Sequence, residues 1–133
     1  MDIIKLVKEK EEKVIKIRRD LHQIPELELE LPKTMEYISK VLDEIGVNYK
    51  KLLNGNAIVV QIDGEQDGKC IAIRADSDAL PVVEETGLPF ASTNGNMHAC
   101  GHDGHTAMAL GACMILNENR DKLKGTVKIF FQP

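Results

Sequence analysis

The chain has few aromatic residues and no long apolar run, and each absence excludes a class of protein. Only 4% of its 133 residues are aromatic, and no basic run carries interleaved aromatics. The net charge of −4 disfavours nucleic acid and anionic membrane surfaces as partners, because both require a basic face. No apolar stretch approaches the roughly 20 residues of a membrane span. The N-terminus mixes Lys and Glu and has no apolar signal-peptide core.

Cysteine is also scarce, which excludes a disulfide framework. The three cysteines, Cys70, Cys100 and Cys113, are an odd number without framework-like spacing. This pattern predicts reduced thiols in a cytoplasmic protein. We find no internal repeat, low-complexity segment or interdomain linker. A hydrophobic fraction of 43% and this length predict a single domain with a buried core.

Hydrophobic periodicity predicts an α/β fold in the order α-α-β-β-β-α-β. Apolar residues at helical spacing indicate surface helices over 2–22, with Ile4, Val7 and Leu21 in the buried stripe, and from Pro32 to a stop at Gly46. Short apolar runs predict the strands, and an almost wholly apolar segment predicts a buried helix. The expected strands are 47–53, 57–62, 69–75 and 126–131, and the expected buried helix is 104–118. This order favours a sheet covered by helices, whose last two strands are joined by a crossover helix.

The densest cluster of chemically active side chains lies at residues 97–105, between the third strand and the buried helix. The stretch reads Met-His-Ala-Cys-Gly-His-Asp-Gly-His and holds three of the four histidines. Thiolate and imidazole bind zinc and similar metals, so Cys100 and His102 are candidate ligands. The alternative is a buried free cysteine beside a capping histidine. Asp103 could cap the helix or hydrogen-bond a ligand imidazole, and His105 could be a ligand, a substrate contact or a surface residue.

Two further segments carry charged residues with less specific patterns. Asp76 and Asp78 leave the third strand on the same face and could orient a ligand or bind substrate. Taken alone, the segment is better explained as a solvated turn with an Arg–Asp pair. Residues 18–27, Arg-Arg-Asp-Leu-His-Gln-Ile-Pro-Glu-Leu, indicate a helix end followed by a break, which is a structural role.

Together these segments resemble the aminoacylase and carboxypeptidase-G type of metallopeptidase, in its amidohydrolase branch. That branch includes hippurate hydrolases and N-acyl-amino-acid amidohydrolases. The resembling blocks occur in the family's order and are residues 18–27, 73–81, 84–89, 97–105 and 128–133. The resemblance implies part of a three-layer α/β/α catalytic domain with a mixed sheet.

The resemblance also implies a two-metal site that holds zinc or manganese. Cys100 and His102 stand at metal-ligand positions, and Cys100 stands where wider relatives use a bridging Asp. Arg74 stands where those relatives carry a ligand histidine, but a guanidinium cannot bind a metal. Asp76 is then expected to support a ligand rather than bind the metal itself. Asp78, Asp103 and His105 are expected to support the ligands or to contact substrate.

The family places its general-base glutamate immediately after the strand that ends Phe-Gln-Pro, and this sequence ends at Pro133. We therefore expect residues 1–133 to form the N-terminal part of the catalytic domain, without the lid or dimerisation domain. The family activity is hydrolysis of an N-acyl amino acid, and we expect the 133-residue chain alone to be inactive. We also expect homo-oligomers, since strand 128–131 would present an unpaired edge. The alternatives are a non-catalytic metal-binding or interaction module and a hydrolase with Cys100 as nucleophile.

Overall fold

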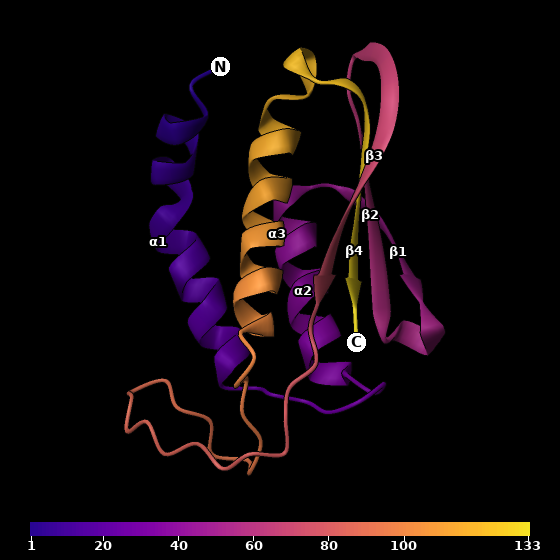
Figure 1. Ribbon diagram of the computed structural model, residues 1–133. Helices are drawn as coiled ribbons and strands as arrows, with labels where there is room; N and C mark the ends of the chain where they lie inside the picture. The colour runs from indigo at the N-terminus through magenta and orange to yellow at the C-terminus, as the bar shows by residue number, and fades with distance from the viewer.

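The computed structural model describes residues 1–133, and its elements follow the predicted order (Figure 1). The helices are α1 (Ile3–His22), α2 (Pro32–Ile45) and α3 (His102–Glu118), and the strands are β1 (Asn48–Leu52), β2 (Ala57–Asp63), β3 (Gln66–Asp76) and β4 (Lys124–Gln132). Two 3-10 turns, η1 (Leu53–Gly55) and η2 (Arg120–Lys122), complete the chain. None of the helices combines the length and apolar composition that crossing a bilayer requires.

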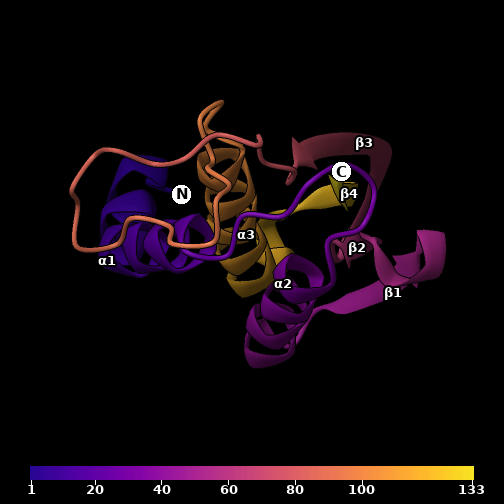
Figure 2. The same ribbon diagram turned by 90° about the horizontal axis from the view of Figure 1, so that it is seen from below.

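The four strands form one mixed sheet in the order β1-β2-β4-β3. β1, β2 and β4 pair antiparallel, whereas β3 and β4 pair parallel and are connected through α3. The predicted crossover helix is thereby confirmed. All three helices lie on the same side of the sheet, and α1 packs against the outer side of α3 (Figures 1 and 2). The chain therefore contributes two of the layers of the expected three-layer arrangement.

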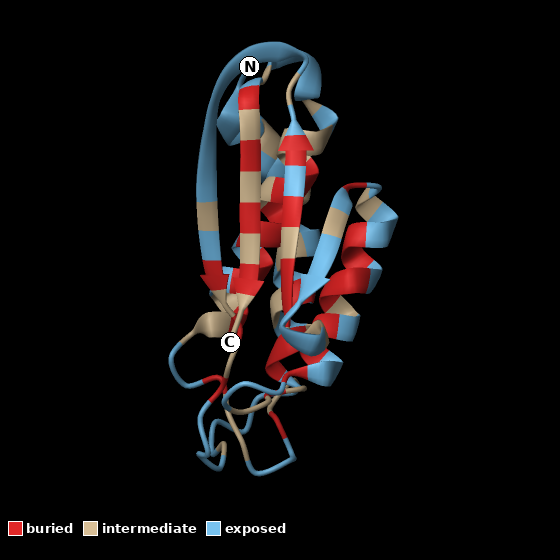
Figure 3. Cartoon of the chain, turned by 90° about the vertical axis from the view of Figure 1, so that its right-hand side faces the viewer, coloured by how far each residue is buried: buried red, intermediate tan, exposed pale blue.

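β4 is an inner strand, because β2 and β3 flank it on both sides. The expectation that residues 128–131 present an unpaired edge is therefore wrong for this chain. The edges belong to β1 and β3. β3 also begins three residues earlier than predicted, and its pairing with β4 shifts register between Gln66 and Cys70. Most of β3 is exposed (Figure 3), so apolar periodicity did not mark its first residues.

The core lies between the sheet and the helices. Residues of β4 alternate between buried and partly exposed, as expected for a strand with one covered face (Figure 3). The α1 stripe is buried only in its second half, where Leu21 is covered, while Ile4 and Val7 are exposed. α3 was expected to be buried all round, but Met108 is 61% exposed. This side of α3 borders a groove of about 410 Å³ next to α1 that no other element covers.

The fold brings the predicted functional segments to one end of the molecule. β3 ends at Asp76, and α3 begins at His102 at the same end, with the irregular loop 77–101 between them (Figure 1). Gly101 adopts a left-handed conformation, φ 81°, at the N-terminus of α3. The helix therefore starts two residues earlier than predicted, and His102 belongs to its first turn. This junction of strand end and helix start is where open α/β sheets place their ligands.

Candidate metal centre

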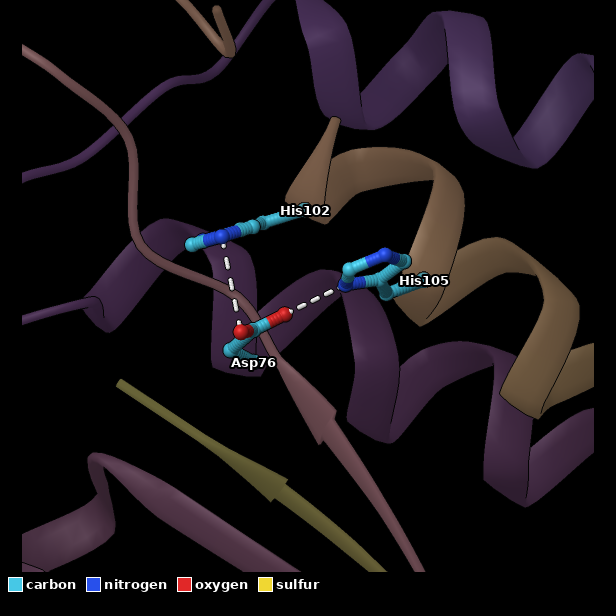
Figure 4. Close-up of side chains that lie close together, drawn as sticks. All are labelled: Asp76, His102 and His105. Atoms are coloured by element: carbon cyan, nitrogen blue, oxygen red, sulfur yellow. Dashed lines mark hydrogen bonds and ion pairs between the residues drawn. The ribbon is translucent and has the colours of Figure 1, made fainter. Parts of the chain in front are cut away.

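Asp76, His102 and His105 come together at this junction and form what we term the carboxylate–histidine group (Figure 4). One ligand atom of each lies within 4.8 Å of the others. Asp76 is the last residue of β3, and the two histidines are three residues apart on α3. Because residues at that spacing share one face of a helix, both imidazoles point toward the end of β3.

His102 is held in one orientation by Asp78. Its Nδ1 lies 3.0 Å from the Asp78 backbone oxygen and 2.8 Å from Asp78 Oδ1. A carbonyl oxygen only accepts hydrogen bonds, so Nδ1 carries the hydrogen and Nε2 keeps a free lone pair. That Nε2 faces Asp76 Oδ2 at 3.4 Å. A histidine whose second nitrogen donates to a carboxylate or carbonyl is the usual arrangement for a metal ligand.

His105 closes the other side of the group. Its Nδ1 lies 2.6 Å from Asp76 Oδ1, and its ring stacks on that of His102 with centroids 5.5 Å apart. Burial of the Asp76 carboxyl opposes its ionisation, but the hydrogen bond with His105 and the nearby imidazoles outweigh burial. The pKa of Asp76 is therefore below its usual 3.8, and the carboxylate is ionised at neutral pH.

Cys100 lies outside the carboxylate–histidine group. It is exposed and precedes the left-handed Gly101, and His102 groups with Asp76 and His105 instead. Metal binding by Cys100 stays a prediction. Arg74 Nη1 lies 3.8 Å from Asp76 Oδ2, so the Arg–Asp pair considered as an alternative for this segment also occurs. It lies at the end of β3, next to the two histidines, and not in a solvated turn.

Asp103 lies in a separate, buried cluster. Its Oδ2 accepts from His22 Nδ1 at 2.7 Å and pairs with Arg18 Nε at 2.9 Å. Its Oδ1 accepts the Gly104 N–H at 2.9 Å. None of its hydrogen bonds reaches His102 or His105. Asp103 thus bonds an imidazole, as one alternative proposed, but that imidazole belongs to α1.

Sequence reasoning missed the functional interest of His22 and Glu84. Both side chains are buried, and His22 Nε2 lies 2.8 Å from Glu84 Oε1. His98 is also buried, and neither of its ring nitrogens has a hydrogen-bond partner. Burial lowers the pKa of His98, which therefore stays uncharged at neutral pH. No spacing rule connects these residues, because they meet only through the tertiary fold.

The donors of the carboxylate–histidine group suit a divalent metal. Two imidazole nitrogens and a carboxylate oxygen are ligand types that zinc and manganese accept in proteins. The donor atoms come from the end of a strand and the first turn of a helix, which are rigid supports. The Asp78 contact prepares His102 Nε2 for binding. These residues therefore fit a metal site.

Comparison with known proteins agrees with the fold and the motifs. The model of peptidase family M20/M25/M40 matches residues 72–133. The chain is 50% identical to N-acetyl-L-cysteine deacetylase of Bacillus subtilis over 124 residues, covering 92% of this chain and 30% of that protein. It is 42% identical to N-acyl-L-amino acid amidohydrolase of Geobacillus stearothermophilus, covering 98% of this chain and 36% of that protein.

A solved structure gives the same result in three dimensions. A dinuclear metal-binding peptidase of the M20 family from Bacillus subtilis superposes with a TM-score of 0.89 at 46% identity, over 95% of this chain and 36% of that chain. The chain thus spans about a third of the length of the relatives that it matches. In its motifs, its fold and these identities, this chain is similar to the members of peptidase family M20/M25/M40.

Proposed function

We propose that the protein to which this chain belongs hydrolyses the amide bond of N-acyl amino acids and depends on a divalent metal. The observation that carries the proposal is the carboxylate–histidine group, with Asp78 fixing the His102 tautomer. The names of the relatives, which include a deacetylase and an amidohydrolase, support an amide substrate. The matched peptidase that binds two metals supports a metal at this end of the sheet.

The residues of this chain hold and orient the metal rather than transfer protons. His102 and His105 would bind it, with Cys100 as a further ligand supplied by the segment before α3. We propose Asp76 as a ligand too, in place of the supporting role expected from the sequence, because its carboxylate lies beside both imidazoles. When bound, zinc or manganese supplies Lewis acidity, which polarises a carbonyl and favours ionisation of water. A glutamate is the usual proton acceptor in such chemistry, but none belongs to the carboxylate–histidine group. We therefore expect residues 1–133 alone to bind metal without hydrolysing N-acyl amino acids.

Metal content tests this site. We expect the purified chain to bind zinc or manganese in near-stoichiometric amounts, and H102A and C100A to lose most of it. C70A is the matched control, because Cys70 is also an exposed free cysteine but lies on β3 away from the group. Elemental analysis after dialysis, with circular dichroism to verify folding, is the measurement. A wild-type chain without metal would contradict the proposal, and full retention by C100A would remove Cys100 from the ligand set.

A non-catalytic metal-binding module is the second candidate. Such a module would need only a set of donors for the ion, and the carboxylate–histidine group offers three donor side chains. Stoichiometric metal in a full-length protein that releases no amino acid from N-acetyl or benzoyl substrates would support this candidate. The third reading, a Cys100-nucleophile hydrolase, is disfavoured because no imidazole hydrogen-bonds to Cys100. Inactivation by iodoacetamide together with resistance to EDTA would favour it.

The remaining expectations concern metal, partners and location. We propose zinc or manganese in a two-metal site, a small N-acyl amino acid as the partner, and no nucleic acid or membrane partner. We also propose a homo-oligomer in the cytoplasm, where the three free cysteines would stay reduced. Comparing activity after reconstitution with each metal would identify the native ion.

A further inference from the structure

One imidazole, that of His22, contacts both helix α3, which carries His102 and His105, and the loop 77–101, which follows Asp76. Its Nδ1 bonds Asp103 Oδ2 at 2.7 Å, and its Nε2 lies 2.8 Å from Glu84 Oε1 in an ion-pair contact outside hydrogen-bond geometry. Asp103 directly follows His102 on α3. Glu84 lies on the loop 77–101, which begins with Asp78 beside the end of β3. The ring is only 2% exposed, so neither contact competes with water.

Glu84 organises the loop on its side of His22. Its Oε1 also accepts the Ser92 N–H at 3.0 Å, and its Oε2 accepts the Thr86 hydroxyl at 2.5 Å. A single carboxylate thereby bonds two positions of the loop that are six residues apart, Thr86 and Ser92. Phe90 of the same loop meets the His22 ring edge to face, with centroids 5.7 Å apart. The loop is therefore folded against the end of α1 at His22.

Asp103 makes the corresponding contacts on α3. Its side chain is fully buried, and it receives Arg18 as well as His22 from α1. Its second oxygen caps the Gly104 N–H within the first turn of the helix. Moving Asp103 would thus move the turn that holds His102 and His105. Separating the buried Asp103 carboxylate from His22 would cost free energy, because the charge would lose a partner. The contact with His22 therefore holds the first turn of α3 in place.

We propose that His22 is a positioning residue for the candidate metal centre: it holds the loop 77–101 and the first turn of α3 in one relative arrangement. The inference rests on the proposed metal site for its functional meaning. It differs from a purely structural role, because it predicts that a change in the Glu84 contact of His22 also loosens the first turn of α3 at Asp103. Glu84 and Gly104 share no hydrogen bond, whereas His22 contacts both Glu84 and the Asp103 carboxylate that bonds Gly104, so we expect the coupling to pass through the His22 ring.

Amide hydrogen exchange on the metal-free chain tests the coupling. We expect H22F to speed exchange by about tenfold at both Ser92, bonded to Glu84, and Gly104, bonded to Asp103. E84Q tests the same coupling without replacing the His22 ring, and we expect faster exchange at Gly104 as well as at Ser92. I17V is the control, since Ile17 is buried on α1 but makes none of these polar contacts. If H22F does not fold, the exchange rate of the Gly104 amide in E84Q decides whether the two elements are coupled. Unchanged exchange at Gly104 in E84Q would overturn the inference.

Metal affinity connects the inference to function. We expect the Kd for Mn²⁺, measured by titration calorimetry, to rise about tenfold in folded H22F or E84Q, which is the size of effect seen when groups that support metal ligands are removed. The Kd should stay unchanged in I17V. Equal affinity in all folded variants would show that the His22 contacts do not position the metal site and would overturn the inference. A wild-type chain that binds neither Mn²⁺ nor Zn²⁺ would instead contradict the proposed function, and the exchange data would still decide whether His22 couples the two elements.

Discussion

Glu84 is a carboxylate whose burial and hydrogen bonds have opposite effects on its charge. Burial favours the protonated form, but the Ser92 N–H, the Thr86 hydroxyl and the nearby His22 together favour the anion. The pKa of Glu84 is therefore below its usual value of 4.5. The native state accordingly binds a proton at lower pH than the unfolded chain does. This difference stabilises the folded state above pH 4.5, and the stabilisation disappears as pH falls through the native pKa.

The variant E84Q should therefore lose stability in a pH-dependent way. At pH 7 we expect a free energy of unfolding lower by about 1.5 kcal/mol, the lower end of the range for hydrogen bonds to a charged group. Below pH 4.5 the difference between wild type and E84Q should shrink, because the wild-type carboxylate also becomes protonated. Urea denaturation of both proteins between pH 3 and pH 7, about the range over which Glu titrates, gives the difference in their free energies of unfolding at each pH.

E85Q is the control for that comparison, because Glu85 is the exposed neighbour in the same loop. It should leave the free energy of unfolding almost unchanged across the same pH range. A constant difference between wild type and E84Q at all pH values would show that the ionised carboxylate does not stabilise the loop.

Helices α1 and α3 approach each other closely at Gly111. A Cβ atom placed there would lie 2.8 Å from Val14 Cγ2 on α1, well inside van der Waals contact. Gly104, about two turns earlier on α3, has open space where its Cβ atom would lie. Because Val14 is β-branched and stiff at χ1, its methyl group cannot easily turn away. The two glycines therefore have different roles on one helix.

Alanine substitutions should separate these roles. G104A should stabilise the protein by about 0.5–1 kcal/mol, since alanine loses less backbone entropy in a helix. G111A gains the same helical preference but must displace Val14, and we expect a net loss of about 1 kcal/mol from overpacking. Thermal or urea denaturation gives both values. The double variant V14A/G111A should recover part of the lost stability. A G111A variant more stable than the wild type would show that α1 can move away from α3 at little cost in free energy.

The helices and strands were predictable from sequence where local signals are strong. The stop at Gly46 appears as a left-handed C-cap with φ 80°, and the break after His22 follows from Pro25. The first residues of β3 were not predictable, because an exposed edge strand has no apolar alternation. Asp76 and Asp78 were expected to share one face of the strand; both contact His102, although Asp78 lies beyond the end of β3. The contacts of His22 could not be predicted, because its partner Asp103 lies 81 residues away in the chain.

At the scale of the whole molecule, the sheet has one long exposed edge. β3 pairs only with β4, and Ile71 is 59% exposed on it. Unpaired backbone groups on an apolar edge strand favour pairing with another chain. The predicted self-association therefore keeps its physical basis, although the edge belongs to β3 and not to β4.

A lysine on that edge should weaken self-association. We expect the wild-type chain to form dimers or larger species at high micromolar concentration and I71K to shift toward monomer, because charged residues on an edge strand oppose strand pairing. L53K is the control, since Leu53 is similarly exposed but lies in the η1 turn. Sedimentation velocity over a concentration series is the measurement. A wild-type chain that stays monomeric throughout would contradict the expectation.

The strand order also sets the time at which the centre can form during synthesis. Asp76 leaves the ribosome before α3, but β3 has no partner among the earlier strands, since only β4 connects it to β2. Until Lys124–Gln132 has been translated, nothing in the sheet holds Asp76 opposite His102 and His105. A nascent chain therefore carries all three side chains for some time before it can bring them together. The carboxylate–histidine group is thus completed by a strand that contributes none of its three side chains.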